Sequence, residues 1–289
     1  MSISVLPAAL PKKVGVLGGG RMGAGIAHGF LIKGSHVVVV ERDEASALAA
    51  RERIQSSAAK SVERRAVDCN LDEILSRLEV SVNYGAFGGR KLVVEAVPEI
   101  WDLKISSLRA VEEHLDTDAF LASNTSSLSV SRLASGLKRP ANFLGLHFFN
   151  PVPASTLIEV VIGGQTRPEL VDAARRWVEA LDKTPVVVND APGFASSRLG
   201  VAIALEAMRM LEEGVASADD IDNAMVLGYK HPTGPLKTTD IVGLDVRLGI
   251  AEYLHSTLGD RFAPPQILRD KVEGGELGRK SGTGFYNWS

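Results

Sequence analysis

The glycine-rich stretch VGVLGGGRMGAGIAHGF, residues 14–30, constrains the fold of this chain more than any other segment. Gly18, Gly20 and Gly23 have the spacing G-x-G-x-x-G, which alone is weak evidence because the chain contains 28 glycines. An apolar run precedes these glycines, and apolar residues spaced by four positions follow them until Gly34. The first pattern is typical of a buried strand and the second of an amphipathic helix. The stretch therefore predicts a strand, a tight turn and a helix.

A second strand completes this unit. Residues 36–40, HVVVV, form another apolar run, and Glu41 follows it, 21 residues after Gly20. An acid at this place is the last part of the dinucleotide-binding fingerprint, in which a pyrophosphate rests on the helix N-terminus. Glu41 is suited to accept ribose hydroxyls and to repel a 2′-phosphate, which favours NAD over NADP, whereas Arg42 beside it favours a phosphate. We predict these residues as cofactor-binding: Gly18, Gly20, Met22, Gly23 and Glu41.

Strands and helices alternate along the rest of the first 190 residues. Apolar runs predict strands at 78–82, 91–97, 119–123, 143–148, 156–162 and 184–190. Helical patterns cover 44–68, 71–78, 99–115 and 168–182. This alternation predicts an α/β fold of the Rossmann type, a doubly wound and mostly parallel sheet with helices on both faces.

The pattern changes at NDAPGF, residues 189–194, after which only helical periods are found: 195–213, 217–227, 240–258 and 264–273. Ser217 is the expected N-cap of the second of these helices. We predict a disordered tail over 1–12, a Rossmann-like NAD-binding domain over 13–189 and a smaller all-helical C-terminal domain over 190–289. The helical domain is expected to close the substrate site and to form a homodimer.

Composition narrows the class of protein. The formal net charge of −3 lacks the basic surplus of a nucleic-acid-binding protein, and no apolar run reaches the length of a membrane span. Cys69 is the single cysteine, so no internal disulfide framework exists, and no Cys/His spacing resembles a metal site. The weakly apolar stretch near the N-terminus is not preceded by the basic segment of a signal peptide. We therefore expect the protein to be cytoplasmic.

Two polar residues in apolar runs indicate where chemistry takes place. His147 lies at the end of the predicted strand 143–148, at the edge where parallel sheets bind ligands. Glu159 interrupts the apolar run TLIEVVI, where a buried acid is costly unless a charged or polar group meets it. Together they would form a base with an orienting carboxylate. Alternatively, His147 is a hydrogen-bonded core histidine. The segment SNTSSL, 123–128, also follows a strand, and is either a substrate contact or a helix-start turn.

Nine motifs together resemble the L-3-hydroxyacyl-CoA dehydrogenase family in order and spacing. They are GGGRMGAGIA, VVEAVPE followed by a lysine, SNTSSL, GLHFFNPVP, LIEVV, DAPGF, HPTGPL, DIVGLD and GRKSGTGFY. The resemblance extends from Lys13 to Trp288 and is greatest to short bacterial members that act on substrates such as 3-hydroxybutanoyl-CoA. It implies an NAD-dependent oxidoreductase that converts (3S)-3-hydroxyacyl-CoA to 3-oxoacyl-CoA by hydride transfer.

The resemblance also implies roles for matching residues. His147 resembles the catalytic base that takes the hydroxyl proton, and Glu159 resembles its paired carboxylate. Ser126 and Asn150 match residues at the substrate hydroxyl and the nicotinamide. Further matching positions contact the cofactor or CoA: Glu99, Lys104 and Lys280 for NAD, and Ser57 and Arg64 for CoA.

Two residues depart from the family pattern. Ser197 stands in PGFASSRL where the family usually has an asparagine that holds the histidine and the acyl oxygen. A serine can still donate one hydrogen bond, so we expect altered rather than lost activity. Glu41 replaces the more common aspartate, with the same function and a longer reach.

Three alternatives remain at this point. The same chemistry could act on an acyl group bound to a carrier protein. A β-hydroxyacid oxidation like that of 6-phosphogluconate shares the fold plan, but it uses a lysine base. The chain could also be a non-catalytic dinucleotide-binding or structural relative, although the presence of His147, Glu159 and Ser126 argues against this.

Overall fold

The computed structural model describes residues 10–288, so most of the predicted tail over 1–12 lies outside the described residues. The chain divides into two compact units, Met1–Asp190 and Ala191–Ser289. Each unit has an apolar core of its own.

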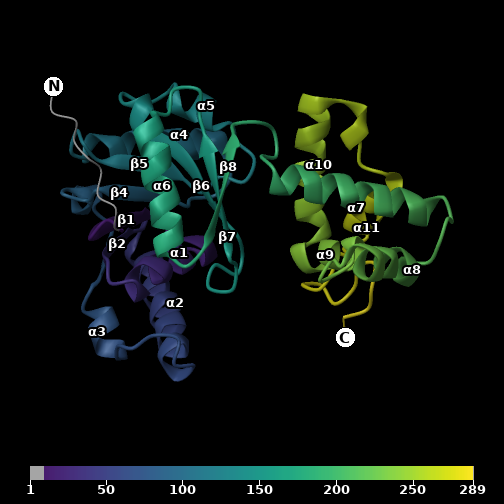
Figure 1. Ribbon diagram of the computed structural model, residues 1–289, viewed down its shortest axis with the longest axis horizontal. Coiled ribbons are helices and arrows are strands. Elements are labelled where there is room, and N and C mark those ends of the chain that lie inside the picture. The colour runs from purple at the N-terminus through teal and green to yellow at the C-terminus, as the bar shows by residue number, and fades with distance from the viewer. Residues whose placement is uncertain (1–9, 289) are drawn as a thin grey trace. The chain divides into compact units, whose positions relative to one another are not determined.

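The first unit is built on an eight-stranded sheet with the order β3-β2-β1-β4-β5-β6-β7-β8 (Figure 1). Every neighbouring pair is parallel except β6 and β7, which are antiparallel. The first six strands have the order of dinucleotide-binding sheets, with the reversal between β1 and β4. The strands are β1 (Lys13–Leu17), β2 (His36–Val40), β3 (Leu78–Ser81), β4 (Leu92–Glu95), β5 (Phe120–Ser123), β6 (Phe143–Phe148), β7 (Leu157–Ile162) and β8 (Thr184–Asn189).

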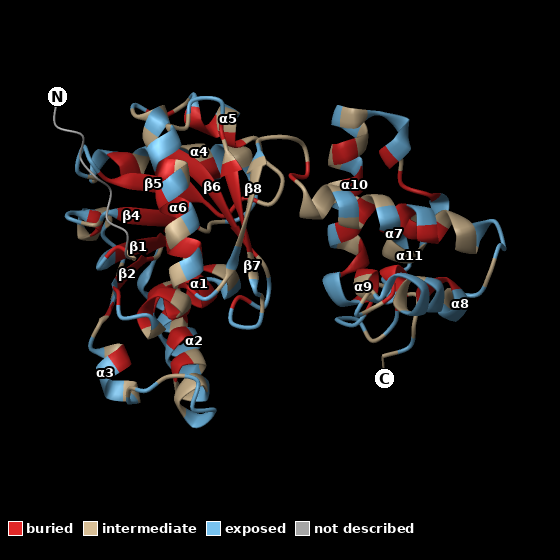
Figure 2. Cartoon of the chain, viewed as in Figure 1, coloured by how far each residue is buried: buried red, intermediate tan, exposed pale blue. Residues whose placement is uncertain are grey.

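Helices cover both faces of this sheet. Apolar side chains of α1, α2 and α6 share one core cluster with alternate residues of the strands, because successive strand residues point to opposite faces. In Figure 1, α6 lies in front of the strands and α4 behind them, and Figure 2 shows most of the strands as buried. The helices are α1 (Arg21–Ile32), α2 (Glu44–Glu63), α3 (Leu71–Leu75), α4 (Trp101–Glu113), α5 (Val130–Ala134) and α6 (Pro168–Ala180), with short 3₁₀ turns η1 (Tyr84–Phe87) and η2 (Pro140–Asn142).

One predicted helix of this unit was too long. The expected helix over 44–68 ends at Glu63, because Arg65 has a left-handed backbone with φ of 53°. The Arg65 and Ala66 N–H groups then donate back to the carbonyls of Val62 and Ser61, which closes the last turn. The sequence offers no glycine at this place, so the end could not be predicted.

The second unit is helical, and its described residues contain isolated β-bridges but no strand. The Ser217 side chain accepts a hydrogen bond from the Asp220 N–H, which confirms the predicted N-cap. The single helix predicted over 240–258 was wrong, since Gly243 with φ of 108° separates two helices. The elements are α7 (Ser196–Glu212), α8 (Ala218–Asn223), the π-turn η3 (Ala224–Gly228), α9 (Pro235–Val242), α10 (Leu244–Leu258), the 3₁₀ turn η4 (Asp260–Phe262) and α11 (Gln266–Glu273).

A buried aspartate holds the C-terminal segment onto this unit. Asp240 is 1% exposed, and its carboxylate accepts hydrogen bonds from the Phe285 N–H, the Tyr286 N–H and the Trp288 indole. A Cβ on Gly284 would lie 2.3 Å from Asp240 Oδ1, so only glycine allows this approach. The motif GRKSGTGFY therefore has a structural role in unit 2.

Candidate active site

The glycine turn lies at the carboxyl end of β1, where the strand order reverses. Gly18 has φ of 87°, a backbone conformation that favours glycine. A Cβ on Gly23 would lie 1.7 Å from the Gly18 carbonyl oxygen, so glycine at this position allows α1 to approach the turn. A Cβ on Gly20, in contrast, would meet nothing within 4 Å. The protein itself does not require glycine at position 20, and the absence of a side chain leaves space for a ligand.

The start of α1 and the end of β2 also fit a dinucleotide. Gly20 is the N-cap of α1 and provides no side-chain cap, so the first N–H groups can face an anionic phosphate. Glu41 follows β2, and its carboxylate accepts hydrogen bonds from the Gly19 N–H at 2.6 Å and the Arg42 N–H at 3.1 Å. These contacts hold the carboxylate beside the turn. Met22 lies in the first turn of α1 and packs against the core.

A buried ionic network joins the ends of β4 and β5. Glu95, with no exposed surface, accepts hydrogen bonds from Lys104 at 2.8 Å, the Val97 N–H at 2.7 Å and the Ser123 hydroxyl at 2.6 Å. Lys104 is 1% exposed, and its ammonium group also meets the Val97 carbonyl at 3.0 Å and Glu99 at 3.2 Å. All three N–H donors of the Lys104 ammonium group are therefore occupied by protein groups. The contact between Lys104 and NAD that the resemblance implies stays a prediction.

Glu99 connects this network to the segment that carries Ser126. Its Oε1 accepts hydrogen bonds from the Thr125 hydroxyl (2.5 Å), the Ser126 N–H (2.9 Å) and both donors of Ser127 (3.0 and 3.1 Å). Burial raises the pKa of Glu99, but the Lys104 charge and these hydrogen bonds outweigh it, so that the pKa lies below its ordinary value. The carboxylate thus stays ionised and fixes the backbone at Ser126.

His147 and Glu159 face each other across β6 and β7. They are directly opposite in the antiparallel register, and His147 Nδ1 lies 2.7 Å from Glu159 Oε2. His147 is 4% exposed and Glu159 has no exposed surface. His147 is the last residue but one of β6, and Asn150 is the second residue after the end of this strand. The structure therefore brings together the two side chains that the sequence suggested would meet.

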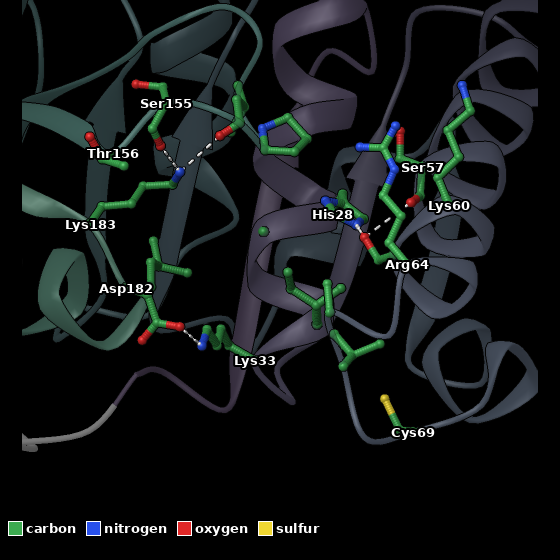
Figure 3. Close-up of a pocket in the computed structure, with 18 of the residues that line it drawn as sticks. His28, Lys33, Ser57, Lys60, Arg64, Cys69, Ser155, Thr156, Asp182 and Lys183 are labelled. Carbon is green, nitrogen blue, oxygen red and sulfur yellow. Dashed lines mark hydrogen bonds and ion pairs between the residues drawn. The ribbon is translucent and has the colours of Figure 1, made fainter.

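A cavity of about 690 Å³ lies beside α1 and α2 and contains the two residues predicted for CoA, Ser57 and Arg64 (Figure 3). Lys60 lies on the same wall, and Lys183 lies on the opposite wall. Arg64, Lys60 and Lys183 all carry positive charge, so the cavity is suited to bind an anionic group. The family resemblance pointed to Ser57 and Arg64, whereas no sequence feature pointed to the opposite wall of the cavity.

Two residues of this cavity were missed as site residues. Lys183 donates to the carbonyl oxygens of Val152 and Ser155, which ties the segment between β6 and β7 to the start of β8. Burial lowers the pKa of Lys183, although Asp182 opposes this effect. His28 is 1% exposed, and its ring contacts the Ser61 hydroxyl at 2.9 Å. Burial, followed by the Lys183 charge, lowers the pKa of His28. No motif pointed to either residue.

The remaining predicted site residues belong to unit 2. Ser197 is half-buried in the first turn of α7. Lys280 binds both carboxylate oxygens of Asp245 at 2.6 Å, so in this structure its ammonium group is paired within its own unit. Burial raises the pKa of Asp245, but the contact with Lys280 and further hydrogen bonds bring it below its ordinary value.

Two classes of feature are absent from the part of the chain that the structure describes. Within residues 10–288, no helix is both long and apolar enough to cross a membrane. In the same range, no group of three or more histidine, cysteine, aspartate or glutamate residues is arranged to hold a metal ion.

Comparisons with known proteins agree with this geometry. Residues 13–191 match the family model described as 3-hydroxyacyl-CoA dehydrogenase, NAD binding domain, and residues 193–288 match 3-hydroxyacyl-CoA dehydrogenase, C-terminal domain. A probable 3-hydroxybutyryl-CoA dehydrogenase of Deinococcus radiodurans is 39% identical over 277 residues, 96% of this chain and 100% of that protein. The 3-hydroxybutyryl-CoA dehydrogenase of Mycobacterium tuberculosis is 39% identical over 286 residues, 96% and 98% of the two chains. The crystal structure of (S)-3-hydroxybutyryl-CoA dehydrogenase from Ralstonia eutropha has a TM-score of 0.92 and 35% identity, covering 96% of this chain and 99% of its own.

The mostly parallel sheet, the glycine turn and Glu41 define a dinucleotide-binding protein of the Rossmann type, and the matched relatives make it an NAD-dependent oxidoreductase. The models of the N-terminal and C-terminal domains of one family together match nearly the whole chain. The chain belongs to the 3-hydroxyacyl-CoA dehydrogenase family. The predicted fold class, the family, the NAD cofactor and the NAD-dependent dehydrogenase class are thereby confirmed.

Proposed function

We propose that this protein interconverts a short-chain (3S)-3-hydroxyacyl-CoA and the 3-oxoacyl-CoA, with 3-hydroxybutanoyl-CoA as a representative substrate. The observation that carries the proposal is the His147–Glu159 pair at 2.7 Å, in the same sheet as a turn suited to a dinucleotide. The names of the relatives, 3-hydroxybutyryl-CoA dehydrogenases at 35–39% identity over nearly the full length, support the substrate class.

His147 acts as the general base in oxidation. Its Nδ1 is held by Glu159, so the hydroxyl proton is exchanged at Nε2. Glu159 orients the ring and stabilises the imidazolium that forms, which makes it a positioning residue. NAD, when bound, supplies the acceptor for the hydride that leaves C3. In the reverse direction, the imidazolium returns its proton to the oxygen of the ketone.

Other residues bind and orient the reactants. Ser126 contacts the substrate oxygen, and the Glu99 network fixes the backbone at this residue. Asn150 contacts the nicotinamide, while Glu99, Lys104 and Lys280 contribute to the cofactor site. Ser57 and Arg64 bind CoA, a role supported by the cationic cavity in which they lie.

Unit 2 completes the enzyme in this proposal. Ser197 contacts the acyl group in place of the usual asparagine. The helical unit also forms a homodimer, which the exposed apolar side chains of Leu199, Leu227, Val246 and others support. A cytoplasmic location agrees with the chemistry, since CoA thioesters and NADH are substrates of the cell interior.

Turnover of acetoacetyl-CoA with NADH, followed by the loss of NADH absorbance, tests the proposal. Oxidation of NADH with release of the (3S)-hydroxy product is expected. A protein that binds NADH but consumes none with acetoacetyl-CoA would be a non-catalytic relative. Turnover of a carrier-bound acyl group without turnover of the CoA thioester would replace CoA by a carrier protein.

A further inference from the structure

His28 of α1 has a buried ring nitrogen without a partner. The residue is 1% exposed and lines the cavity beside α1 and α2. Its Nε2 lies 2.9 Å from the Ser61 hydroxyl, whereas its Nδ1 is buried and forms no hydrogen bond with any residue within 10–288. A buried polar atom without a partner is costly. Because this atom belongs to a residue that lines a cavity, a ligand in that cavity can provide the missing partner.

The contacts of Ser61 determine which nitrogen of the neutral His28 ring carries the proton. The Ser61 hydroxyl donates to the Ser57 carbonyl at 3.3 Å. Since a hydroxyl has a single proton, its oxygen accepts the hydrogen bond from His28 Nε2–H. In the neutral ring, Nδ1 therefore carries no proton and can only accept a hydrogen bond. Protonation of the ring converts Nδ1 into a donor.

The charged groups around His28 favour an anion in this cavity. In Figure 3, His28 lies between Lys183 and the cations of α2. The charged and titratable residues that line the cavity with it come from α1 (Lys33), α2 (Lys60 and Arg64), the segment after α2 (Asp68 and Cys69) and the connection between α6 and β8 (Asp182 and Lys183). Four of these are cations and two are acids, and Asp182 is already paired with Lys33. A phosphate group here would be compensated by cations from two sides.

An anion in the cavity would change the protonation of His28. Burial, and then the Lys183 charge, lower the pKa of His28, so these protein groups keep the ring neutral at neutral pH. A phosphate would offset the Lys183 charge and present acceptor oxygens to Nδ1, and both effects favour the protonated ring. Lys183 can also bind the anion directly, because the carbonyls of Val152 and Ser155 use only two of its three N–H donors.

We propose that His28 donates a hydrogen bond from Nδ1–H to a phosphate group of CoA in this cavity, so that CoA binding takes up a proton from solvent. This inference rests on the proposed function, because CoA is the anion that the proposed function assigns to the cavity. All the residues involved belong to unit 1. The affinity for CoA should rise as the pH falls through the range in which the ring titrates, by at most about tenfold per pH unit for one proton.

Titration calorimetry with CoA, dephospho-CoA and pantetheine tests the inference. Saturating NADH keeps these ligands out of the cofactor site, and two buffers of different ionisation enthalpy give the number of protons taken up. We expect uptake with CoA and a Kd that falls at least about threefold between pH 7.5 and 6. Dephospho-CoA lacks the 3′-phosphate, a monoester that itself titrates near pH 6. Uptake with both nucleotides supports the inference with the pyrophosphate as the partner, and uptake with CoA alone supports it with the 3′-phosphate. Pantetheine, which has no phosphate, should take up no proton.

His28→Gln separates the titration of the ring from its contact with Ser61. The glutamine amide can still donate to the Ser61 hydroxyl but does not titrate, so proton uptake should disappear and the Kd for CoA should no longer fall in acid. His36→Gln, at an exposed position of β2, is the matched control and should take up protons like the parent. Imidazole NMR of the parent protein needs no variant, and the pKa of His28 should rise when CoA is added.

Three results would overturn the inference and leave the proposed function intact, provided that CoA binding is weakened in Arg64→Ala. The first is CoA binding without proton uptake. The second is an affinity that falls in acid, which would mean that neutral His28 accepts an N–H group of the ligand. The third is equal proton uptake with pantetheine. CoA binding that is unchanged in Arg64→Ala would contradict both the inference and the assignment of the cavity to CoA, even if acetoacetyl-CoA is turned over.

Discussion

A carboxylate with no exposed surface needs a fixed partner, and Glu159 has one in His147. The pair could be predicted from the sequence because a glutamate inside an apolar run has few ways to be stable. The partner could be named because His147 was the only histidine at the end of a predicted strand on the ligand edge. At the scale of single residues, a polar group in an apolar context was therefore the most informative signal.

Replacement of His147, the proposed base, gives the most direct test of this pair. His147→Gln should lower kcat by roughly a hundredfold or more, the usual size for a general base, while NADH affinity stays unchanged because the glycine turn is untouched. Stopped-flow turnover and NADH fluorescence titration measure the two quantities. His36→Gln, at an exposed position of β2, is the control and should behave like the parent. Near-parental turnover in His147→Gln would mean that another group moves the proton.

Glu99 predicts a pH dependence of stability. Its folded pKa is lowered from the ordinary value of 4.5, so its stabilising contribution is complete above the unfolded pKa and is lost as the pH falls through the folded pKa. The free energy of unfolding, measured by urea denaturation from pH 6 downwards, should therefore fall more steeply in the parent than in Glu99→Gln. Equal slopes in the acid range would show that the contacts of Glu99 do not favour its charged form.

At the scale of elements, the ends of β4 and β5 act together through Glu95. Glu95→Gln should weaken the contacts to Lys104 and Ser123, cost about 1–3 kcal/mol of unfolding free energy and release the segment before Ser126. We expect kcat/KM to fall by about tenfold to a hundredfold, because small displacements of positioning groups are costly. Steady-state kinetics and thermal unfolding measure both effects.

Glu112→Gln is the matched control for this prediction. Glu112 is 6% exposed and accepts hydrogen bonds from the Lys138 and Arg139 N–H groups at 2.7 Å, away from the carboxyl edge. The Glu112→Gln variant should lose about as much unfolding free energy as Glu95→Gln but keep the kcat/KM of the parent protein. If the two variants have the same kinetic constants, the Glu95 network has only a structural role.

The cationic face of α2 makes a separate prediction. Arg64→Ala should raise KM for acetoacetyl-CoA several-fold and leave KM unchanged for a short acetoacetyl thioester without the nucleotide, because in the proposed function only the CoA part of the substrate reaches the cavity. Arg51→Ala, on an exposed part of the same helix and outside the cavity, should change neither value. Equal effects of Arg64→Ala on both thioesters would remove α2 from the CoA site.

The sequence predicted elements well where an apolar period was uninterrupted, as in β1, α1 and β2. It failed at helix ends that depend on backbone geometry alone, such as Arg65, and at Gly243, whose left-handed conformation divides α9 from α10. It also missed the Glu95–Lys104–Ser123 network. These residues belong to different elements, and only the strand order brings them together.

At the scale of the whole molecule, the two units have separate apolar cores, and this arrangement predicts two unfolding transitions in calorimetry. Asp240→Asn should lower only the transition of unit 2, because the amide keeps one acceptor oxygen and can no longer satisfy all three of the Phe285, Tyr286 and Trp288 donors. We expect a cost of about 1–3 kcal/mol for each donor left unsatisfied. NADH at about 100 times its Kd should stabilise the transition of unit 1 by about 2.7 kcal/mol. Asp260→Asn, at an exposed position, is the control. One transition that responds equally to the variant and to NADH would contradict this prediction.

The antiparallel register of β6 and β7 has a consequence for how such enzymes diversify. The ladder between the two strands holds His147 and Glu159, the pair proposed for proton transfer, while the connection over 149–156 supplies Val152, Pro153, Ser155 and Thr156 to the cavity wall. Insertions or substitutions in that connection can reshape the wall without shifting His147 relative to Glu159, because the strand pairing sets their distance. If the proposed roles hold, selection can therefore act on substrate choice and on proton transfer as separate traits, although a single hairpin encodes both.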